Sequence, residues 1–477
     1  MNVALLRRGV VGGRTRPATA SVDLVSETAI VWFRRDLRVH DQPMFLAAAP
    51  RALALFVLDP ALLRPSGAAR LTFLYRSLRA LDASLGGRLT VVRGDPAEVV
   101  PRVAAQLNAA AVHLAADYGP YGRTRDEAVE KALVDDGRLL VRTGSPYAVA
   151  PGRVRKADGD PYKVFTPFRR AWAEHGWRGP ADTDASTVSW LDPIGPSTIP
   201  DDVEVDAELP DAGEAAALTR WRAFLDGAVG EYSDGRDRPD KPGTSRMSPY
   251  LKYGQIHPRT MLADLASRSS ESVQTYTTEI AWREFYADIL FLRPDSARKN
   301  YDRSFDALPV ASGAAARTAF DAWREGRTGF PIVDAGMRQL REQAWMHNRV
   351  RMIVASFLVK DLHLPWWWGA RHFMRLLVDG DLASNQHGWQ WTAGSGTDAS
   401  PYFRVFNPIT QGERFDPDGD YVRRFVPELR GVPGKSVHQP WALAGGVPAG
   451  YPEPMVDHKA ERIEALARYE RVKAARG

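Results

Sequence analysis

The sequence predicts two domains of different class, an α/β domain with a doubly wound parallel sheet and then an all-α domain. Short apolar runs that alternate with helical periodicity predict the first, because strands and crossover helices alternate in a parallel sheet. Apolar positions at helical spacing, with almost no strand-like alternation, predict the second. A stretch rich in Pro, Asp, Ser and Thr at 180–215 separates the two patterns.

Five apolar runs are the expected strands, at residues 29–33, 52–58, 89–92, 111–115 and 139–141. Between the second and third runs, leucines recur along one face of an expected helix, at Leu71, Leu74, Leu78, Leu81 and Leu85. We therefore expect the α/β domain at 28–150, an inter-domain linker at 151–212 and the helical domain at 213–477. The segment 1–27 is arginine-rich, and we expect a disordered extension there, with a transit peptide as the alternative.

Composition limits the chemistry that the chain can perform. Its 477 residues include no cysteine, which excludes a disulfide framework, a thiolate metal site and a thiol nucleophile. Redox chemistry must then come from a cofactor or from aromatic side chains. The net charge of +5 permits a nucleic-acid partner without requiring one. No apolar run is long enough to cross a bilayer, so we expect a soluble, cytoplasmic protein.

The segment PGTSRMSPYLKYGQ at 242–255 predicts a loop that enters a helix. Ser248 is the expected N-cap and Pro249 the first helical residue, with Thr244 and Ser245 close by. A capped helix start with neighbouring hydroxyls can bind a diphosphate, although most capped helices bind nothing.

Polar and aromatic side chains share one face of the helix expected at 273–292, namely Tyr276, Glu279, Arg283 and Tyr286, with Trp282 beside them. Glu279 and Arg283 are either a solvated ion pair or part of a binding site.

A further helix, expected after Pro331 within 331–361, carries Trp345, Asn348 and Met352 on one face, flanked by Arg349 and Arg351. An asparagine within an otherwise apolar helix is costly to bury without a partner, and a ligand is one candidate partner.

The segment DGDLASNQHGWQW at 379–391 combines two carboxylates, an amide and two indoles. We reject a metal site, because no histidine or third carboxylate follows at metal-ligand spacing. Trp389 and Trp391 point about 200° apart on a helix, so one can face inward while the other faces a cavity. Any single one of the 14 tryptophans, ten of which follow residue 220, can also be plain core filler.

Taken together, eight segments resemble the photolyase and cryptochrome family: VWFRRDLRVHD at 31–41, YKVFTPF at 162–168, GTSRMS at 243–248, WREFY at 282–286, GFPIVDAGMRQL at 329–340, WMHNRVRM at 345–352, DGDLASNQHGWQW at 379–391 and PYFRVFNP at 401–408. The likeness extends from about residue 29 to the C-terminus. It implies an N-terminal antenna domain and a helical domain that holds a U-shaped FAD. Within the family, the chain is similar to the class I cyclobutane pyrimidine dimer photolyases, which repair UV-damaged DNA in light.

The resemblance also assigns residues to FAD. It places Tyr232 and the loop Thr244, Ser245, Arg246, Met247 and Ser248 at the diphosphate. Around the flavin and adenine it places Tyr276, Glu279, Arg283, Asn348, Arg351, Asp379, Asp381 and Asn385. Arg351 and Asp379 would form an ion pair against the isoalloxazine, and Asn385 would face its N5.

For the lesion, the resemblance implies a dimer flipped out of the duplex and stacked on Trp282 and Trp391. Glu279 would hydrogen-bond the base edge, and Asn348 and Met352 would complete the floor. Relatives that repair (6-4) photoproducts carry a histidine pair at these last two positions, so the sequence favours cyclobutane dimers. Phosphates around the lesion would be bound by Arg236, Arg349 and Arg404.

The family often relays electrons to the flavin through three tryptophans, of which Trp389 and Trp366 match the first two. The third position falls on Gly313. Photoreduction is therefore expected either to end early or to pass through Trp367, Trp368, Trp323 or a tyrosine.

The second chromophore is expected to be an 8-hydroxy-5-deazaflavin rather than methenyltetrahydrofolate, because residues 116–129 lack the polar residues expected for a folate; an empty site is a further alternative. Three alternatives to dimer repair stay open: a cryptochrome-type photoreceptor, a (6-4) photolyase, and a flavin-binding domain without DNA affinity. Repair is favoured by Trp282, Trp391 and Asn348, which cryptochromes tend to lose, and by the sequence stopping at ARYERVKAARG (467–477) where cryptochromes usually carry a C-terminal extension. We expect a monomer.

Overall fold

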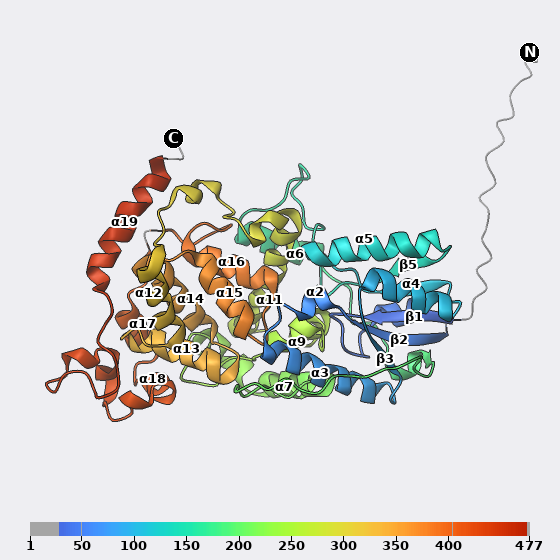
Figure 1. The fold of residues 1–477 in the computed structure, drawn as a ribbon, viewed down its shortest axis with the longest axis horizontal. Helices are drawn as coiled ribbons and strands as arrows, with labels where there is room; N and C mark the ends of the chain where they lie inside the picture. The colour runs from blue at the N-terminus through green and yellow to red at the C-terminus, as the bar shows by residue number, and fades with distance from the viewer. Residues whose placement is uncertain (1–27, 49, 403, 475–477) are drawn as a thin grey trace, which may run out of the picture.

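A computed structural model of the protein describes residues 28–48, 50–402 and 404–474. The extension predicted at 1–27 lies outside the described residues. An α/β half and a helical half lie side by side, and the last helix, α19 (His458–Ala474), lies at the end farthest from the sheet (Figure 1). The predicted fold class is confirmed.

A parallel sheet forms the α/β half, with strand order β3-β2-β1-β4-β5. Its strands are β1 (Thr28–Phe33), β2 (Arg51–Leu58), β3 (Leu89–Arg93), β4 (Ala111–Leu114) and β5 (Leu139–Arg142). Each predicted strand is found to within one residue at either end. Buried parallel strands are near-continuous apolar runs, which makes them easy to recognise in a sequence.

Helices cover both faces of this sheet (Figure 1). On one face, Ile30 and Trp32 of β1 pack with α4 (Pro96–Gln106) and α5 (Pro120–Asp135). On the other, the alternate residues Val31 and Phe33 pack with α3 (Ala68–Ser84) and with the helical half. Two short helices, α1 (Pro43–Ala47) and α2 (Pro60–Leu63), follow β1 and β2. One apolar core therefore joins the two halves.

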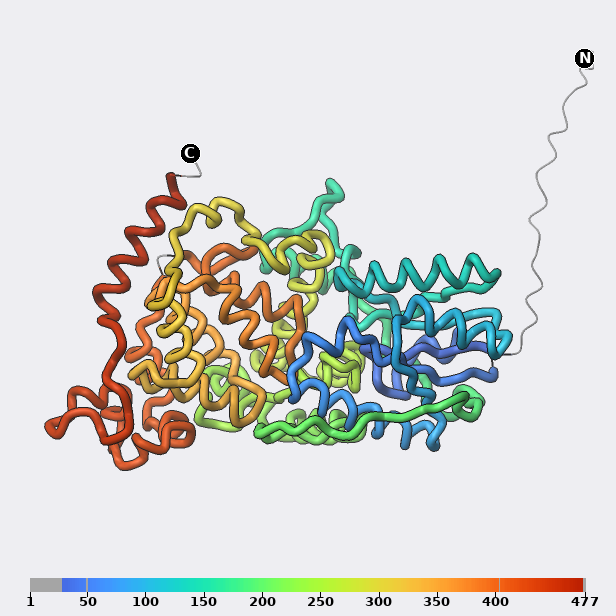
Figure 2. Tube along the Cα trace, in the orientation of Figure 1, coloured from blue at the N-terminus to red at the C-terminus, as the bar shows by residue number. Residues whose placement is uncertain are grey.

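The segment expected as a linker, 151–212, contains more regular structure than its composition indicated. It includes α6 (Phe165–His175) and β6 (Ser189–Trp190), which pairs with β2. Beyond β6 the chain lies along α3, where Thr72 Oγ1 donates to the carbonyl of Val203 at 2.7 Å (Figure 2). The domain boundaries themselves stay a prediction.

The helical half has no strand within the described residues after Trp190, as predicted. Its helices before α19 are α7 (Glu214–Asp226), α8 (Tyr232–Gly235), α9 (Ser248–Tyr253), α10 (Pro258–Ala266), α11 (Glu271–Leu292), α12 (Gly313–Glu325), α13 (Pro331–Gln343), α14 (Asn348–Ser356), α15 (Trp366–Leu376), α16 (Leu382–Ala393), α17 (Pro408–Phe415) and α18 (Asp420–Phe425). None of the described helices is long and apolar enough to span a membrane.

The long helix predicted within 331–361 is wrong, because the chain breaks it after α13. Ala344 adopts a left-handed conformation with φ of 48°. Helix α14 then restarts under a new cap, in which His347 Nδ1 accepts from the backbone N–H of Arg349 at 3.2 Å. A π-helical turn at Phe357–Asp361 follows α14. Trp345 consequently lies between helices and not on the same helical face as Asn348.

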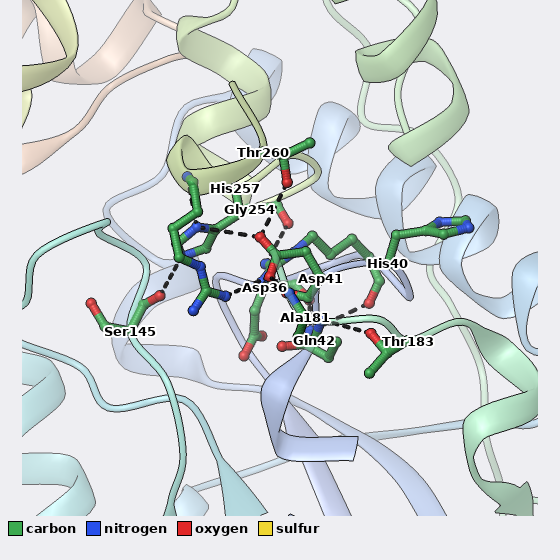
Figure 3. A network of polar contacts seen from close by, with 12 residues as sticks. Asp36, His40, Asp41, Gln42, Ser145, Ala181, Thr183, Gly254, His257 and Thr260 are labelled. Atoms are coloured by element: carbon green, nitrogen blue, oxygen red, sulfur yellow. Dashed lines mark hydrogen bonds and ion pairs between the residues drawn. The ribbon is translucent and has the colours of Figure 1, made fainter. Parts of the chain in front are cut away.

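A buried polar cluster, here called the joint, ties the two halves together (Figure 3). Asp41 accepts from Arg259 Nη2 at 2.6 Å, from the backbone of Ala181 at 2.7 Å and from Thr260 Oγ1 at 3.1 Å. His257 caps α10 by accepting from the backbone N–H of Arg259, and its Nε2 lies 2.7 Å from the carbonyl of Ser145. Asp41, Arg259 and His257 are buried, so the joint fixes the orientation of the halves.

Glu284 of α11 makes a second set of contacts across the halves, and we include it in the joint. Its carboxylate accepts from Trp172 Nε1 at 2.6 Å and from the backbone N–H of Val149 at 3.0 Å and of Ala148. Burial raises the pKa of Glu284, and these donors oppose that shift.

Candidate functional site

An ion pair lies at the centre of the helical half. Arg351 Nη2 of α14 lies 2.8 Å from Asp379 Oδ2, and Ser248 Oγ of α9 donates to the same oxygen at 2.6 Å. The other oxygen, Asp379 Oδ1, is buried and has no hydrogen-bond partner within the described part of the chain. A buried acceptor without a donor is costly in a folded protein, which indicates that a ligand group completes it.

Ser248 is not the N-cap of α9, so this prediction was wrong. The helix begins at Ser248 itself, and Met247 precedes it without a side-chain cap. The Ser248 hydroxyl is instead committed to Asp379, while the Trp345 indole N–H donates to Ser248 Oγ at 3.3 Å. A partner 131 residues away has displaced the local cap.

The preceding loop presents hydroxyls and a strained arginine. Ser245 Oγ lies 2.8 Å from the hydroxyl of Tyr276, and Thr244 is half-buried beside it in sequence. Arg246 has φ of 53°, and its guanidinium lies over the Trp345 ring at 4.3 Å. The loop is thus held at both ends by side chains of the helical half.

Glu279 pairs with an arginine from another element. Its carboxylate lies 2.8 Å from Arg236 Nη2, and both side chains are about one-quarter exposed (27% and 29%). Burial raises the pKa of Glu279, and Arg236 opposes the shift. Tyr232 and Tyr276 contact each other beside this pair at a ring distance of 5.0 Å. Glu279 therefore shares one face of α11 with Tyr276, as expected, but its ion-pair partner is Arg236.

Arg283 does not pair with Glu279, so the simple ion-pair interpretation was wrong. Its guanidinium donates to the carbonyls of Pro146 and Leu251 at 3.1 and 3.3 Å. It also lies 4.6 Å from the centre of the Tyr147 ring. Arg283 therefore connects the helical half to the loop after β5.

Asp381 faces the α/β half. It caps α16 by accepting from the backbone N–H of Ser384 at 3.1 Å, and it pairs with Arg35 Nη2 at 2.8 Å. Burial opposes ionisation, but Arg35 and Lys252 hold the pKa of Asp381 well below its usual range. Asp379 and Asp381 thus have different partners, and no cluster of metal-ligating side chains occurs among the described residues.

Helix α16 has one face directed at open space. Asn385, Gly388 and Trp391 follow at three-residue spacing on this face, and all three are half-buried. A Cβ added at Gly388 would meet no atom within 4 Å. Asn385 Nδ2 donates to the carbonyl of Ala370 at 3.1 Å. This face therefore has room for a ligand.

Trp389 points the other way, as its spacing from Trp391 indicated. It is 3% exposed and contacts Phe373 and Trp323 at ring distances of 5.0 and 6.1 Å. Its indole lies so close to α15 that a Cβ at Gly369 would come 2.1 Å from it, which requires glycine at that position.

Trp282 is supported by a residue to which the sequence motif alone gave no role. Phe165, at the start of α6, stacks on the Trp282 ring at 3.6 Å and 10°. One turn further along α11, Tyr286 stacks on His387 of α16 at 5.6 Å. These contacts pack α11 against α16, the two helices that carry Trp282 and Trp391. The segment YKVFTPF contains Phe165, but nothing in its spacing identifies the stacking partner.

Asn348 is the exposed first residue of α14, so the expectation of a buried mid-helix asparagine was wrong. Met352 follows one turn later and is half-buried. Between them, Arg349 makes two hydrogen bonds to Asp237, at 2.7 and 3.1 Å, and lies over the Phe415 ring at 4.5 Å. Asp237 is a partner that sequence spacing could not identify.

Arg404 is exposed, and its backbone carbonyl is held by a buried side chain. The ammonium of Lys360, which is 1% exposed, donates to the Arg404 carbonyl at 3.0 Å. Burial lowers the pKa of Lys360 to about 7. The loop that carries Arg404 is therefore fixed to the π-helical turn after α14.

A cavity of about 1140 Å³, here called the inter-domain cavity, lies between the halves at the carboxyl ends of β1 and β2. Its walls include Trp32, Arg35 and Phe56 from the α/β half, with Lys252 and Trp366 from the helical half. Burial, with the nearby Arg35, lowers the pKa of Lys252 to about 7. Ligands of open α/β sheets bind at the carboxyl ends of strands, so this cavity is a second candidate binding site.

Comparison with known proteins places both halves in one group. Residues 29–187 match a family described as DNA photolyase, and residues 276–471 match the FAD binding domain of DNA photolyase. A Streptomyces griseus protein named deoxyribodipyrimidine photo-lyase is 42% identical over 93% of this chain and 99% of its own length.

Solved structures of a photolyase and a cryptochrome have the same fold as this chain. A bacterial class III photolyase from Agrobacterium tumefaciens has a TM-score of 0.84 at 39% identity and covers 96% of this chain and 100% of its own. A cryptochrome from Synechocystis has a TM-score of 0.85 at 28% identity, over 92% and 98% of the two chains.

Proposed function

The chain belongs to the DNA photolyase family, and on that premise we propose that it repairs UV-damaged DNA in light by splitting cyclobutane pyrimidine dimers. The observation that carries the proposal is the open face of α16, which has Asn385 at one end and Trp391 at the other. It lies on the helix that packs against α11, which carries Trp282.

The residues of the helical half fit FAD. Asp379 Oδ1 is a buried acceptor in need of a donor, and the Arg351 guanidinium beside it supplies positive charge. Asn385 offers a neutral amide on the same open face, and Ser245 and Thr244, with Tyr232 nearby, offer hydroxyls to a diphosphate. When bound, reduced and photoexcited, FAD supplies the electron that opens the dimer.

The lesion pocket is proposed to lie between two indoles. Phe165 covers one face of Trp282 and fixes the ring, so the other face can stack on a flipped base. Stacking on such rings contributes about 1–3 kcal/mol per base, which offsets the loss of stacking in the duplex. Glu279 lies one turn before Trp282 on α11, and its carboxyl group is proposed to hydrogen-bond the base edge.

Asn348 and Met352 support a cyclobutane dimer as the substrate. Both lie on one face of α14, and Asn348 is exposed where a lesion would enter. Neither can act as a proton donor in the way that a histidine pair can. A (6-4) photoproduct, whose repair is associated with that pair, is therefore the less favoured substrate.

Three arginines are proposed to hold DNA phosphates near the lesion, namely Arg236, Arg349 and Arg404. In the free protein Arg236 pairs with Glu279 and Arg349 with Asp237, so these carboxylates compete with the phosphates. Binding through phosphates is independent of sequence and weakens with salt.

The inter-domain cavity is proposed to hold the second chromophore, with 8-hydroxy-5-deazaflavin preferred over methenyltetrahydrofolate. Aromatic walls from Trp32 and Phe56 suit a flat ring system, and Arg35 and Lys252 suit an anionic one. The absorption spectrum of the protein as purified tests this, because a deazaflavin adds a band that neither FAD nor a folate has.

A single chain carries every proposed site residue, which supports a monomer. Light scattering of the purified protein tests that expectation directly.

Repair itself is tested with chemically reduced protein and an oligonucleotide that contains one thymine dimer, under blue light. The expected result is intact thymine that appears only with both light and protein. A protein that binds FAD and responds to light but restores no thymine would instead support the cryptochrome-type alternative, for which the Synechocystis structure is a close structural match.

A further inference from the structure

Gly313, which falls at the third relay position of the family, cannot carry an electron. It is the exposed first residue of α12, and a Cβ added there would meet no atom within 4 Å. On the same helix Trp323 follows ten residues later, about 15 Å along the axis at 1.5 Å per residue. The route between Trp389 and solvent must therefore use other rings or stop.

The ring contacts of Trp389 lead to α12. Trp389, Phe373 and Trp323 form a buried group in which Trp323 stacks parallel to Phe373 at 6.3 Å and 15°. Trp323 is fully buried, and its Nε1 donates to the carbonyl of Val354 at 3.0 Å. Trp366 packs instead on Trp367 at 5.9 Å and lines the inter-domain cavity.

From Trp323 the rings continue outward. Phe320 stacks on Trp323 at 5.6 Å, and the ring of Trp368 contacts Phe320 at 5.4 Å. His372 contacts both Trp323 and Phe320, at 5.7 and 6.0 Å. Trp368 is partly exposed, so this series of rings runs from the buried Trp389 to solvent.

We propose that Trp323 and Trp368 complete the electron relay of this protein after Trp389, in place of Trp366 and of the missing third tryptophan. The proposal rests on the proposed function, because it needs FAD beside Trp389. With FAD bound beside it, the Trp389 indole would give one electron to the photoexcited, oxidised flavin. Trp323 then gives one electron to Trp389, and Trp368 gives one electron to Trp323.

Proton transfer decides where the relay stops. Oxidised Trp323 keeps its proton, since its Nε1 is buried against the carbonyl of Val354 and has no access to water. Oxidised Trp368 can lose its Nε1 proton to water, which prevents the electron from returning. A soluble thiol then supplies one electron and one proton to the neutral Trp368 radical and becomes a thiyl radical.

The test uses the FAD-loaded protein with oxidised FAD and an added thiol, and follows tryptophan radicals by transient absorption after a blue flash. Trp323→Phe and Trp368→Phe are each expected to lose most of the long-lived, deprotonated tryptophan radical. Trp441→Phe, which changes an indole that packs on Phe330 outside the series, is the matched control and is expected to keep it.

A normal yield of the long-lived radical in either relay variant would overturn the proposal. Because Trp323→Phe removes a buried hydrogen bond and can fail to fold, Trp368→Phe at a partly exposed position carries the test alone if necessary. Repair by the chemically reduced variants separates this proposal from the proposed function: repair needs no relay, so its absence in the unsubstituted protein would contradict the function and not the relay.

Discussion

Two buried polar clusters, the joint and the site around Asp379, use the same residue types in different ways. In the joint, both oxygens of Asp41 accept hydrogen bonds, and both ring nitrogens of the capping His257 have partners. In the site, Asp379 Oδ1 and Nε2 of the capping His347 are buried without a partner among the described residues. The difference indicates that the Asp41 carboxylate and the His257 ring are satisfied within the chain, whereas Asp379 and His347 are completed by a ligand.

The largest expected effect is on the joint. Asparagine, like aspartate, tolerates the backbone φ of 50° at position 41. Asp41→Asn nevertheless leaves Arg259 buried without its charge partner. We expect the free energy of unfolding to fall by about 3 kcal/mol, the lower end of the cost of breaking a buried ion pair. Urea unfolding followed by circular dichroism measures this.

The exposed Asp182→Asn is the matched control for Asp41→Asn, with an expected change below about 0.5 kcal/mol. Equal effects of the two substitutions would show that the joint contributes nothing specific to stability.

Acid is expected to destabilise the site through its capping histidine. Burial, with the nearby Arg349 and Arg351, lowers the pKa of His347 to about 4, although Asp237 opposes the shift. Between about pH 6.5 and about pH 4, the unfolded chain therefore binds a proton at this histidine and the folded chain does not. The free energy of unfolding consequently falls as the pH drops through this range. The full effect is on the order of 3 kcal/mol for this one group.

His347→Asn keeps a residue that can cap α14 but removes the titration. Unfolding measured at several pH values should then show a shallower acid-induced loss for His347→Asn than for the unsubstituted chain. Identical pH profiles would contradict the assigned role of His347.

Paired tryptophans separate recognition from stability. Trp391→Ala in the site is expected to weaken binding of a dimer-containing oligonucleotide by about 1–3 kcal/mol, through lost stacking, with little change in unfolding. Trp172→Phe in the joint removes a hydrogen bond to Glu284. It should lower the free energy of unfolding and leave the DNA affinity nearly unchanged. Fluorescence anisotropy and urea unfolding measure the two quantities, and a loss of DNA affinity in Trp172→Phe alone would invert the comparison.

The smallest expected effect on stability comes from Asp379→Asn. Asp379 Oδ1 has no donor to lose, and Arg351 is 25% exposed and can be rehydrated, so we expect a loss of about 1 kcal/mol. A loss as large as that of Asp41→Asn, measured in the same urea unfolding experiment, would remove the distinction between the two clusters.

The sequence predicts the α/β half well and the helical half less well, for a physical reason. Strands buried on both faces are bounded apolar runs, so their ends are visible in the sequence. In the helical half the apolar spacing continues through Trp345 and Met346, although Ala344 and the His347 cap interrupt the helix. Such a break depends on one backbone conformation and one side-chain bond, neither of which changes the apolar pattern.

For the site residues, too, the sequence shows local positions but not the contacts that decide the structure. Local spacing correctly places Glu279 and Tyr276 on one face of α11, but their partners come from elsewhere. Glu279 binds Arg236, 43 residues earlier, and Trp282 stacks on Phe165, 117 residues earlier. Ser248 likewise binds Asp379 in preference to capping its own helix. Spacing along one helix carries no information on partners that approach from a distant segment.

The central claim is that the incomplete polar atoms around Asp379 are completed by FAD. The most direct measurement is the FAD content per folded chain after purification of the unsubstituted protein, Asp379→Asn and Asp41→Asn. We predict that Asp379→Asn loses its FAD although it is the more stable of the two variants, and that folded Asp41→Asn retains it. Full FAD content in Asp379→Asn, or an equal loss in both variants, would contradict this account.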